Sequence, residues 1–351
     1  MAETAKRAAV VTLVIVGIVV LVLALWRLRL VIALLFLAFV LAAAMRPTVD
    51  ALARGGLPRV GGIVLHYVAL IGIVVGFLWA VVPRAIDQVE QAVPETRSEL
   101  SEEAEGSTGW RHDVLVGLRD RLAELPTTDR LVDPAVEVTL TVLEVALGIF
   151  FVLASAAYWI FERDRAEDLV CSMLPRSRRK KVRATWELID AKLGAYVRGQ
   201  ALLILLVGTV LSFAFWAIDL RYWLLVGAFA GVVEIVPVIG PLAAGALAVG
   251  IGFTDSWKVA LAAGLIVLVV RLIEDYVVIP RVLGDAVGLT PLVVLVSVTA
   301  CGILFGAFAV ILAIPAAAVA ATLLDVIVRN RDPSEEDVPT VMFPAKDAES
   351  A

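Results

Sequence analysis

The sequence predicts an all-α, polytopic membrane protein with about eight transmembrane segments. Apolar residues make up 61% of its 351 residues, and the mean hydropathy is +0.94, whereas soluble domains are only about 45–50% apolar. Long apolar runs recur along the chain, and most have roughly the 17–25 residues that a helix needs to cross a bilayer. Two runs in the C-terminal half are longer and contain prolines, which predicts discontinuous or re-entrant helices there.

Residues 1–82 are expected to contain the first three spans. Their apolar runs cover residues 8–25, 30–45 and 60–82. The first run is longer than the core of a usual signal peptide, and no small-residue cleavage site precedes the following "WRLRL". We therefore interpret it as an uncleaved first span.

Residues 83–134 are rich in charged residues, Ser, Thr and Pro, and they interrupt the apolar pattern. The stretch "RSELSEEAEGSTG" is typical of a solvated turn. After it, apolar residues recur at helical spacing at Val114, Leu115, Leu118 and Leu122. We therefore expect an extramembrane helical insert on the extracytoplasmic side.

Basic residues define the expected orientation of the chain. Residues 135–161 form the expected fourth span, and residues 162–200 form the most basic loop, which includes "RSRRKK". The positive-inside rule places this loop in the cytoplasm. Because four spans precede the loop, the N-terminus is expected on the same side. The segment 329–351 is expected to be a disordered, acidic cytoplasmic tail.

Residues 201–328 are expected to form a core of broken helices. A fifth span covers about residues 201–218, whereas the runs 222–253 and 290–328 are each too long for one span. The first contains "EIVPVIGPLAAG" and the second "AIPAAA". Irregular backbone at membrane depth must be buried in protein or line a wet cavity. Each long run is either one tilted, kinked span or a re-entrant hairpin, and we favour the hairpin.

The run between them, residues 259–279, carries charges that a lipid-facing span would exclude. Arg271, Glu274 and Asp275 lie within it, and Glu234 lies at comparable depth before "IVPVIGP". Each such charge costs roughly 2.5–3.5 kcal/mol on insertion scales. On one helix Arg271 reaches Glu274 at i+3 or Asp275 at i+4, and we expect that it cannot hold both without strain.

Two interpretations of this charged cluster remain open. Carboxylates without full compensation in a dry interior can exchange a proton or bind a cation, which is the chemistry of a coupled transporter. Buried ion networks can also serve only to fix the packing of helices.

Motifs for other classes of protein are missing from the sequence. There is no HExxH, GxSxG or GxxxxGK[ST] motif, and the two histidines, His66 and His112, lie on different segments. Cys171 and Cys301 lie far apart outside any CxxC pattern, so neither a disulfide framework nor a zinc site is expected. The net charge of −5 argues against a nucleic-acid partner. We expect no enzyme, no cofactor and no metal site.

Three stretches of the C-terminal half carry most of these features: "VVEIVPVIGPLAAGALA", "IEDYVVIPRVLGDAVGLTPLVVLVSV" and "GAFAVILAIPAAAV". Together they resemble the signature of the autoinducer-2 exporter (AI-2E) family of bacterial permease-like membrane proteins. The resemblance implies a homo-oligomer in the bacterial cytoplasmic (inner) membrane. The basic loop and the number of spans place both termini in the cytoplasm. Besides the acids, the characteristic positions of the family fall here on Pro237, Gly240, Pro241, Tyr276, Pro280, Arg281, Gly284, Pro291 and Pro315.

The resemblance also implies transport, either export of a small polar molecule such as autoinducer-2 or exchange of a cation against protons. In this hypothesis Glu234, Arg271, Glu274 and Asp275 form the ion-responsive site. The other characteristic positions, including Tyr276 and Arg281, break helices or line the path. The expected partners are the lipid bilayer and a small-molecule or ion substrate. The competing hypothesis is a membrane scaffold that binds a partner through the insert 83–134.

Overall fold

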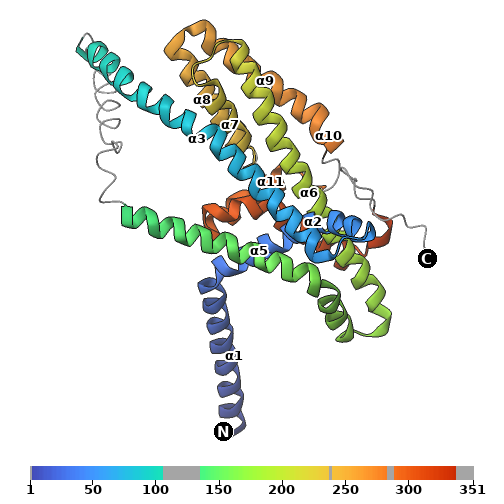
Figure 1. Cartoon of the computed structure of the whole chain (residues 1–351). Helices are drawn as coiled ribbons and strands as arrows, with labels where there is room; N and C mark the ends of the chain where they lie inside the picture. Colours follow the sequence, from blue (N-terminus) through green and yellow to red (C-terminus); the bar gives the residue numbers. More distant parts are fainter. Residues whose placement is uncertain (1, 106–134, 237–238, 283–287, 337–351) are drawn as a thin grey trace. The chain divides into compact units, whose positions relative to one another are not determined.

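The computed structural model describes residues 2–105, 135–236, 239–282 and 288–336 (Figure 1). Within these ranges the chain forms helices and no strands, which confirms the predicted all-α fold. Six helices are long and apolar enough to cross a membrane: Val10–Arg27, Arg29–Arg54, Arg59–Arg84, Val142–Ser172, Arg176–Ala217 and Ala307–Ile327. Shorter apolar helices are Trp223–Val233, Ile239–Asp255 and Pro291–Phe305. The chain is therefore a polytopic membrane protein.

The chain divides into two compact units. Unit 1 comprises Met1–Arg59, Phe150–Gly199 and Val282–Ala351, and unit 2 comprises Val60–Ile149 and Gln200–Arg281. The long helices α3 (Arg59–Glu105), α5 (Ala135–Ser172) and α6 (Arg176–Ala217) each contribute to both units.

Unit 1 is built on helix α2. Its described elements are α1 (Ala2–Arg27), α2 (Arg29–Arg54), parts of α5 and α6, α11 (Pro291–Phe305), η3 (Ala307–Leu312), α12 (Ala313–Ile327) and η4 (Pro333–Glu335). Val40 and Ala43 of α2 pack with Leu193 of α6 in a buried core. The apolar run of α1 has none of its residues buried, as expected of a helix whose surface faces lipid.

The segment 162–200, expected as a basic loop, is helical. It consists of the end of α5, a short turn and the first part of α6, which together form a helical hairpin. Arg163 is buried in this hairpin and is paired there with two acids. Its Nε lies 2.6 Å from Oδ2 of Asp190, and its Nη1 lies 2.9 Å from Oε2 of Glu167. A buried guanidinium needs such partners, since an isolated buried charge is very costly.

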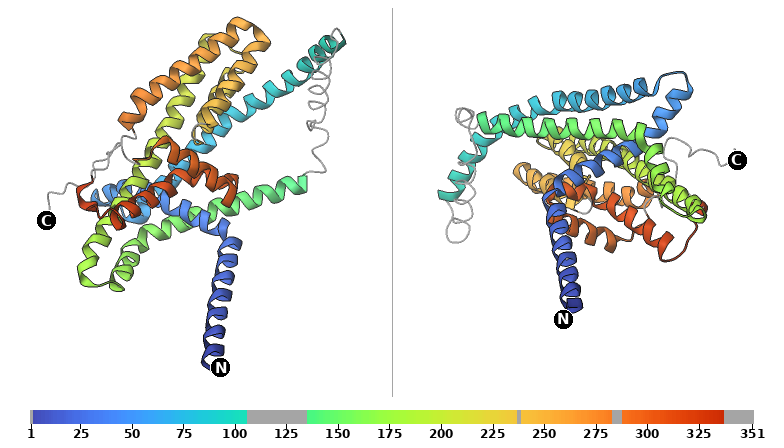
Figure 2. Two further views of the ribbon diagram at one scale, coloured as in Figure 1. Left: turned by 180° about the vertical axis from the view of Figure 1, so that it is seen from behind. Right: turned by 90° about the horizontal axis from the view of Figure 1, so that it is seen from below.

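Unit 2 contains a tightly packed group of small and branched residues. Its described elements are parts of α3, α5 and α6, then α7 (Trp223–Val233), α8 (Ile239–Asp255), α9 (Trp257–Ile273), the π-helical turn η2 (Glu274–Val278) and most of α10 (Ile279–Val282). Phe215 of α6, Val226 of α7 and Ala248 of α8 are fully buried in its core. Helices α8 and α9 run side by side (Figure 2), joined by a turn in which the side chain of Ser256 caps α9.

The first long run, residues 222–253, is two helices rather than one tilted span. Helix α7 ends at Val233, and α8 begins at Ile239 and packs back against it. With 11 residues, α7 is only about 16 Å long, roughly half the thickness of a bilayer core. The helix break predicted at "PVIGP" is therefore present.

The second long run, residues 290–328, is also broken. Helix α11 ends at Phe305. The next residue, Gly306, has a positive φ of 92°, and the chain continues as the 3-10 segment η3 and then α12. Pro315, expected to be the breaker, lies instead in the first turn of α12 and is buried. A proline is tolerated there because the first turn of a helix has no intrahelical acceptor for its N–H groups.

Two further sequence expectations fall partly outside the described residues. Helix α3 continues from the third span through Glu105, but the amphipathic helix expected around residues 114–122 lies outside the described part of the chain. Of the expected tail, residues 329–336 are described and contain η4, whose residue Pro333 is buried. Residues 337–351 lie outside the description.

Candidate functional site

The charged residues predicted from the sequence come together in unit 2. Glu234 directly follows the last residue of α7, Arg271 lies in the last turn of α9, and Glu274 and Asp275 open the turn η2. In η2 the N–H of Ile279 donates to the carbonyl of Glu274, five residues earlier. Such wide turns are rare within helices and often mark functional positions.

Pro280 gives a physical reason for the wide turn. A proline inside a helix has no N–H to donate, and its ring collides with the carbonyl four residues earlier. That carbonyl belongs to Tyr276, in the middle of η2. Widening the helix by one residue relieves the collision while the helix continues into α10.

One guanidinium contacts all three carboxylates. Nη1 of Arg271 lies 3.1 Å from Oε1 of Glu234 and 3.0 Å from Oε2 of Glu274. Nη2 lies 2.9 Å from Oδ1 of Asp275. The expectation that Arg271 could hold only one of its two neighbouring acids was therefore wrong. The planar guanidinium presents two terminal nitrogens as a fork, so each can take a different acid.

The cluster is nevertheless short of positive charge. The side chains of Glu234 and Glu274 are only 7% and 4% exposed, whereas Asp275 is 41% exposed. Three carboxylates share one guanidinium, and a buried carboxylate is stable in its ionised form only with full pairing. A proton or a bound cation can supply the missing compensation, and this is the chemical capacity of the site.

The helix break lies directly beside Glu234. Gln200 of α6 donates from Nε2 to the backbone carbonyl of Glu234 at 3.0 Å, and the N–H of Gly240 donates to Val236 at 2.8 Å. The first bond satisfies a carbonyl at the end of α7, and the second satisfies an N–H in the first turn of α8. A Cβ on Gly240 would overlap the carbonyl of Val233, so the approach of α8 to α7 requires glycine here.

The other residues that match the family pattern lie in several different places. Pro241 lies in the first turn of α8, and Pro280 and Arg281 lie in α10, all in unit 2. Tyr276 is 78% exposed and is not part of the buried cluster. The remaining positions are Pro291 and Pro315 in unit 1, and Pro237 and Gly284 outside the described residues.

Gln200 was missed in the sequence analysis. In the sequence it is only a single amide at the start of the apolar run of α6. Its hydrogen bond to the carbonyl of Glu234 exists because another helix, α7, is broken there. Residues that satisfy backbone groups from a distance are not visible in a local pattern.

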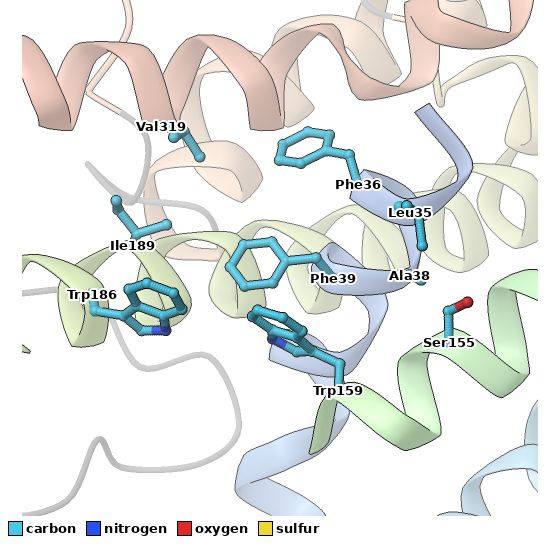
Figure 3. Close-up of a pocket in the computed structure, with 9 residues that line it drawn as sticks. All are labelled: Leu35, Phe36, Ala38, Phe39, Ser155, Trp159, Trp186, Ile189 and Val319. Atoms are coloured by element: carbon cyan, nitrogen blue, oxygen red, sulfur yellow. The ribbon is translucent and has the colours of Figure 1, made fainter. Parts of the chain in front are cut away.

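Unit 1 contains a pocket that the sequence did not predict. Its volume is about 450 Å³ (Figure 3), and its lining residues are Leu35, Phe36, Ala38, Phe39, Ser155, Trp159, Trp186, Ile189 and Val319. The ring of Phe39 meets Trp159 edge-on at 5.2 Å, and Trp159 stacks on Trp186 at 6.2 Å. These walls are almost entirely apolar, in contrast to the acid cluster of unit 2.

The class of protein that these features indicate is a secondary membrane transporter. The chain has apolar spans, a helix broken at "PVIGP" and buried acids beside the break, and discontinuous helices next to polar groups build the binding sites of such transporters. The comparison with known sequences narrows this class. Residues 13–329 match the family described as AI-2E family transporter, and the chain belongs to that family.

Several bacterial relatives are named as transport proteins. The chain is 28% identical over 296 residues to "Putative transport protein YrrI" of Bacillus subtilis, which covers 81% of this chain and 83% of the relative. It is 28% identical over 303 residues to "Putative transport protein MT0215" of Mycobacterium tuberculosis, covering 80% and 79%. For "Putative permease PerM" of Escherichia coli the identity is 24% over 267 residues, covering 71% and 74%. The chain is thus a multi-pass transporter of the bacterial inner membrane.

Proposed function

We propose that the cluster of Glu234, Arg271, Glu274 and Asp275 is the proton- or ion-responsive part of the transport path. The observation that carries this proposal is the charge imbalance, with three carboxylates around one guanidinium and two of the carboxylates almost fully buried. A purely structural ion pair needs only one acid for each cation. The surplus of acids gives the site a reason to take up a proton or a cation.

The position of the cluster favours coupling to movement. Arg271 connects the end of α7, through Glu234, with the turn η2, through Glu274 and Asp275. When one acid is neutralised, its electrostatic attraction to the guanidinium weakens, and the guanidinium shifts toward the other two acids. Because the acids belong to separate elements at a helix break, this shift changes how α7 is held against α9.

The substrate we propose is a small polar molecule of the autoinducer-2 kind, exported in exchange for or together with protons. The second candidate is exchange of a monovalent cation against protons, which the same acid cluster could support. Both assign the same residues to coupling. Flux measured in proteoliposomes with an imposed pH gradient distinguishes them, because only the antiporter moves the cation in the absence of the polar molecule.

The test of the cluster is the pH profile of transport. Glu274→Gln and Asp275→Asn are each expected to give folded protein in the membrane with an abolished or altered pH dependence of flux. The control is Glu162→Gln, because Glu162 lies on the exposed surface of unit 1 and pairs there with Arg165; its pH profile should match that of the unaltered protein. An unchanged profile in both cluster variants would show that the cluster serves only packing.

A further inference from the structure

A second charged site lies in unit 1, on helix α6. The side chain of Lys192 is only 8% exposed. Its Nζ lies 2.6 Å from Oε1 of Glu336 and donates to Oγ1 of Thr322 in α12 at 3.2 Å. A buried ammonium is costly without a counter-charge, and Glu336 supplies a carboxylate from the segment that follows α12. Nothing in the proposed coupling mechanism uses this site.

The described part of the segment that carries Glu336 is held at its start, where the N–H of Arg331 donates to the carbonyl of Asp325 at 3.0 Å and its Nη1 lies 3.5 Å from the carboxylate of Asp325. Oδ1 of Asn330 accepts a hydrogen bond from Lys181 at 2.8 Å, and Pro333 is buried. The side chain of Glu336 is 39% exposed, and the residues between Pro333 and Glu336 are exposed as well. A short segment with one buried residue and exposed hydrogen bonds detaches at a smaller free-energy cost than the unfolding of α6 or α12.

We propose that Lys192 and Thr322 form an anion-binding site for a small carboxylate, and that Glu336 is its displaceable internal ligand. The ammonium of Lys192 donates to the hydroxyl of Thr322 and also faces the carboxylate of Glu336, so Thr322 holds the donor in place for an external anion. Displacement of Glu336 frees the end of this segment from α6, while the hydrogen bond between Asn330 and Lys181 still holds its start. Binding and release are therefore linked, because both carboxylates compete for the same lysine.

The two partners differ in what their removal leaves behind. Among the described residues, loss of Glu336 leaves the buried ammonium with the hydroxyl of Thr322 as its partner. Loss of Lys192 leaves a carboxylate that is already partly exposed. Removing both leaves neither charge of this pair in the protein. Hence Glu336→Ala is expected to lower the melting temperature more than Lys192→Met, and the double variant is expected to regain stability relative to Glu336→Ala alone.

Chemical rescue tests the site directly. The full chain in detergent micelles is heated at fixed pH and ionic strength in sodium chloride or in sodium acetate, with acetate as the carboxylate probe. Acetate is expected to raise the melting temperature of Glu336→Ala selectively, with no such gain in the double variant with Lys192→Met. Glu335→Ala is the matched control, because Glu335 is the exposed neighbour of Glu336.

Two results would overturn the proposal. One is a melting temperature of Glu336→Ala that does not differ between acetate and chloride. The other is an equal acetate effect in the double variant, which would show that acetate acts elsewhere. Glu336→Gln keeps the shape of the side chain without its charge, so it provides the same comparison if the alanine variant does not fold.

Discussion

Arg271 is the residue on which the candidate site depends most. Its two terminal nitrogens hold acids from two elements, the end of α7 and the turn η2. Each acid alone could be exchanged for its amide with little change in shape. The arginine has no such substitute, because the fork geometry and the positive charge are both used.

Replacing Arg271 should therefore destabilise the protein more than replacing any one of the acids. Arg271→Ala leaves Glu234 and Glu274 buried without a cation, and removal of one partner from a buried pair costs about 3–5 kcal/mol. We expect about 3 kcal/mol here, at the low end, because Arg271 is 29% exposed. Thermal unfolding in detergent measures the loss.

Arg271→Lys is the informative companion to the alanine variant. It keeps the charge but replaces the planar fork with one ammonium on a flexible stem. We expect stability between that of Arg271→Ala and that of the unaltered chain, together with an altered pH profile of transport. Full retention of both properties in the lysine variant would show that charge alone matters and that the fork does not.

At the scale of elements, the break between α7 and α8 positions the site. The end of α7 places Glu234 against Arg271, and the first turn of α8 comes close enough to Val233 that only glycine fits at position 240. Helix α7 ends at Val233 and α8 begins at Ile239, and the close approach of Gly240 to the carbonyl of Val233 fixes how the two helices meet. The end of α7 and the first turn of α8 are thus closely packed at this corner.

Gly240→Ala is expected to open this corner. The added methyl group would overlap the carbonyl of Val233, and overpacking of this kind typically costs about 1–3 kcal/mol. Gly250→Ala, in the same helix, is the control, because a Cβ there meets no atom within 4 Å. The control should be neutral or slightly stabilising, since alanine favours helix over glycine by about 1 kcal/mol. Equal melting temperatures for the two variants would contradict the close packing at Gly240.

At the scale of the whole molecule, the two broken runs decide the topology that we propose. If each is a re-entrant hairpin, the turn around Ser256 faces the outside and residues 281–290 face the cytoplasm. If each is a single span, these two segments exchange sides. The short α7 and its return through α8 support the hairpin, as does the turn at Gly306.

Single-cysteine labelling distinguishes the two topologies. Ser256→Cys and Ala286→Cys are introduced separately into a chain in which Cys171 and Cys301 are replaced. A membrane-impermeant thiol reagent added outside intact cells should label the cysteine at position 256 and not the one at position 286. Labelling of position 256 from the cytoplasmic side alone would rule out the hairpin topology.

Much of this protein could be predicted from local patterns. The hydropathy of successive windows identifies an all-helical membrane protein, because a helix that crosses the bilayer needs about 20 predominantly apolar residues wherever the other spans lie. The break at "PVIGP" is equally local, since proline and glycine act on their own backbone. The acids of the site were visible for the same reason, because charges in an apolar run stand out.

The sequence by itself therefore determined the class, the broken helices and the identity of the charged residues. Only the tertiary structure decided that one guanidinium holds Glu234, Glu274 and Asp275 together, that Gln200 satisfies the broken end of α7, and that Glu336 reaches the buried Lys192. The contacts of Arg271 with Glu274 and Asp275 are local, and the sequence offered each of them as an alternative. The contacts of Glu234 with Arg271, of Gln200 with Glu234 and of Lys192 with Glu336 join residues far apart in the chain. These distant contacts depend on how helices pack and not on the composition of any one segment, so no window of sequence contains them.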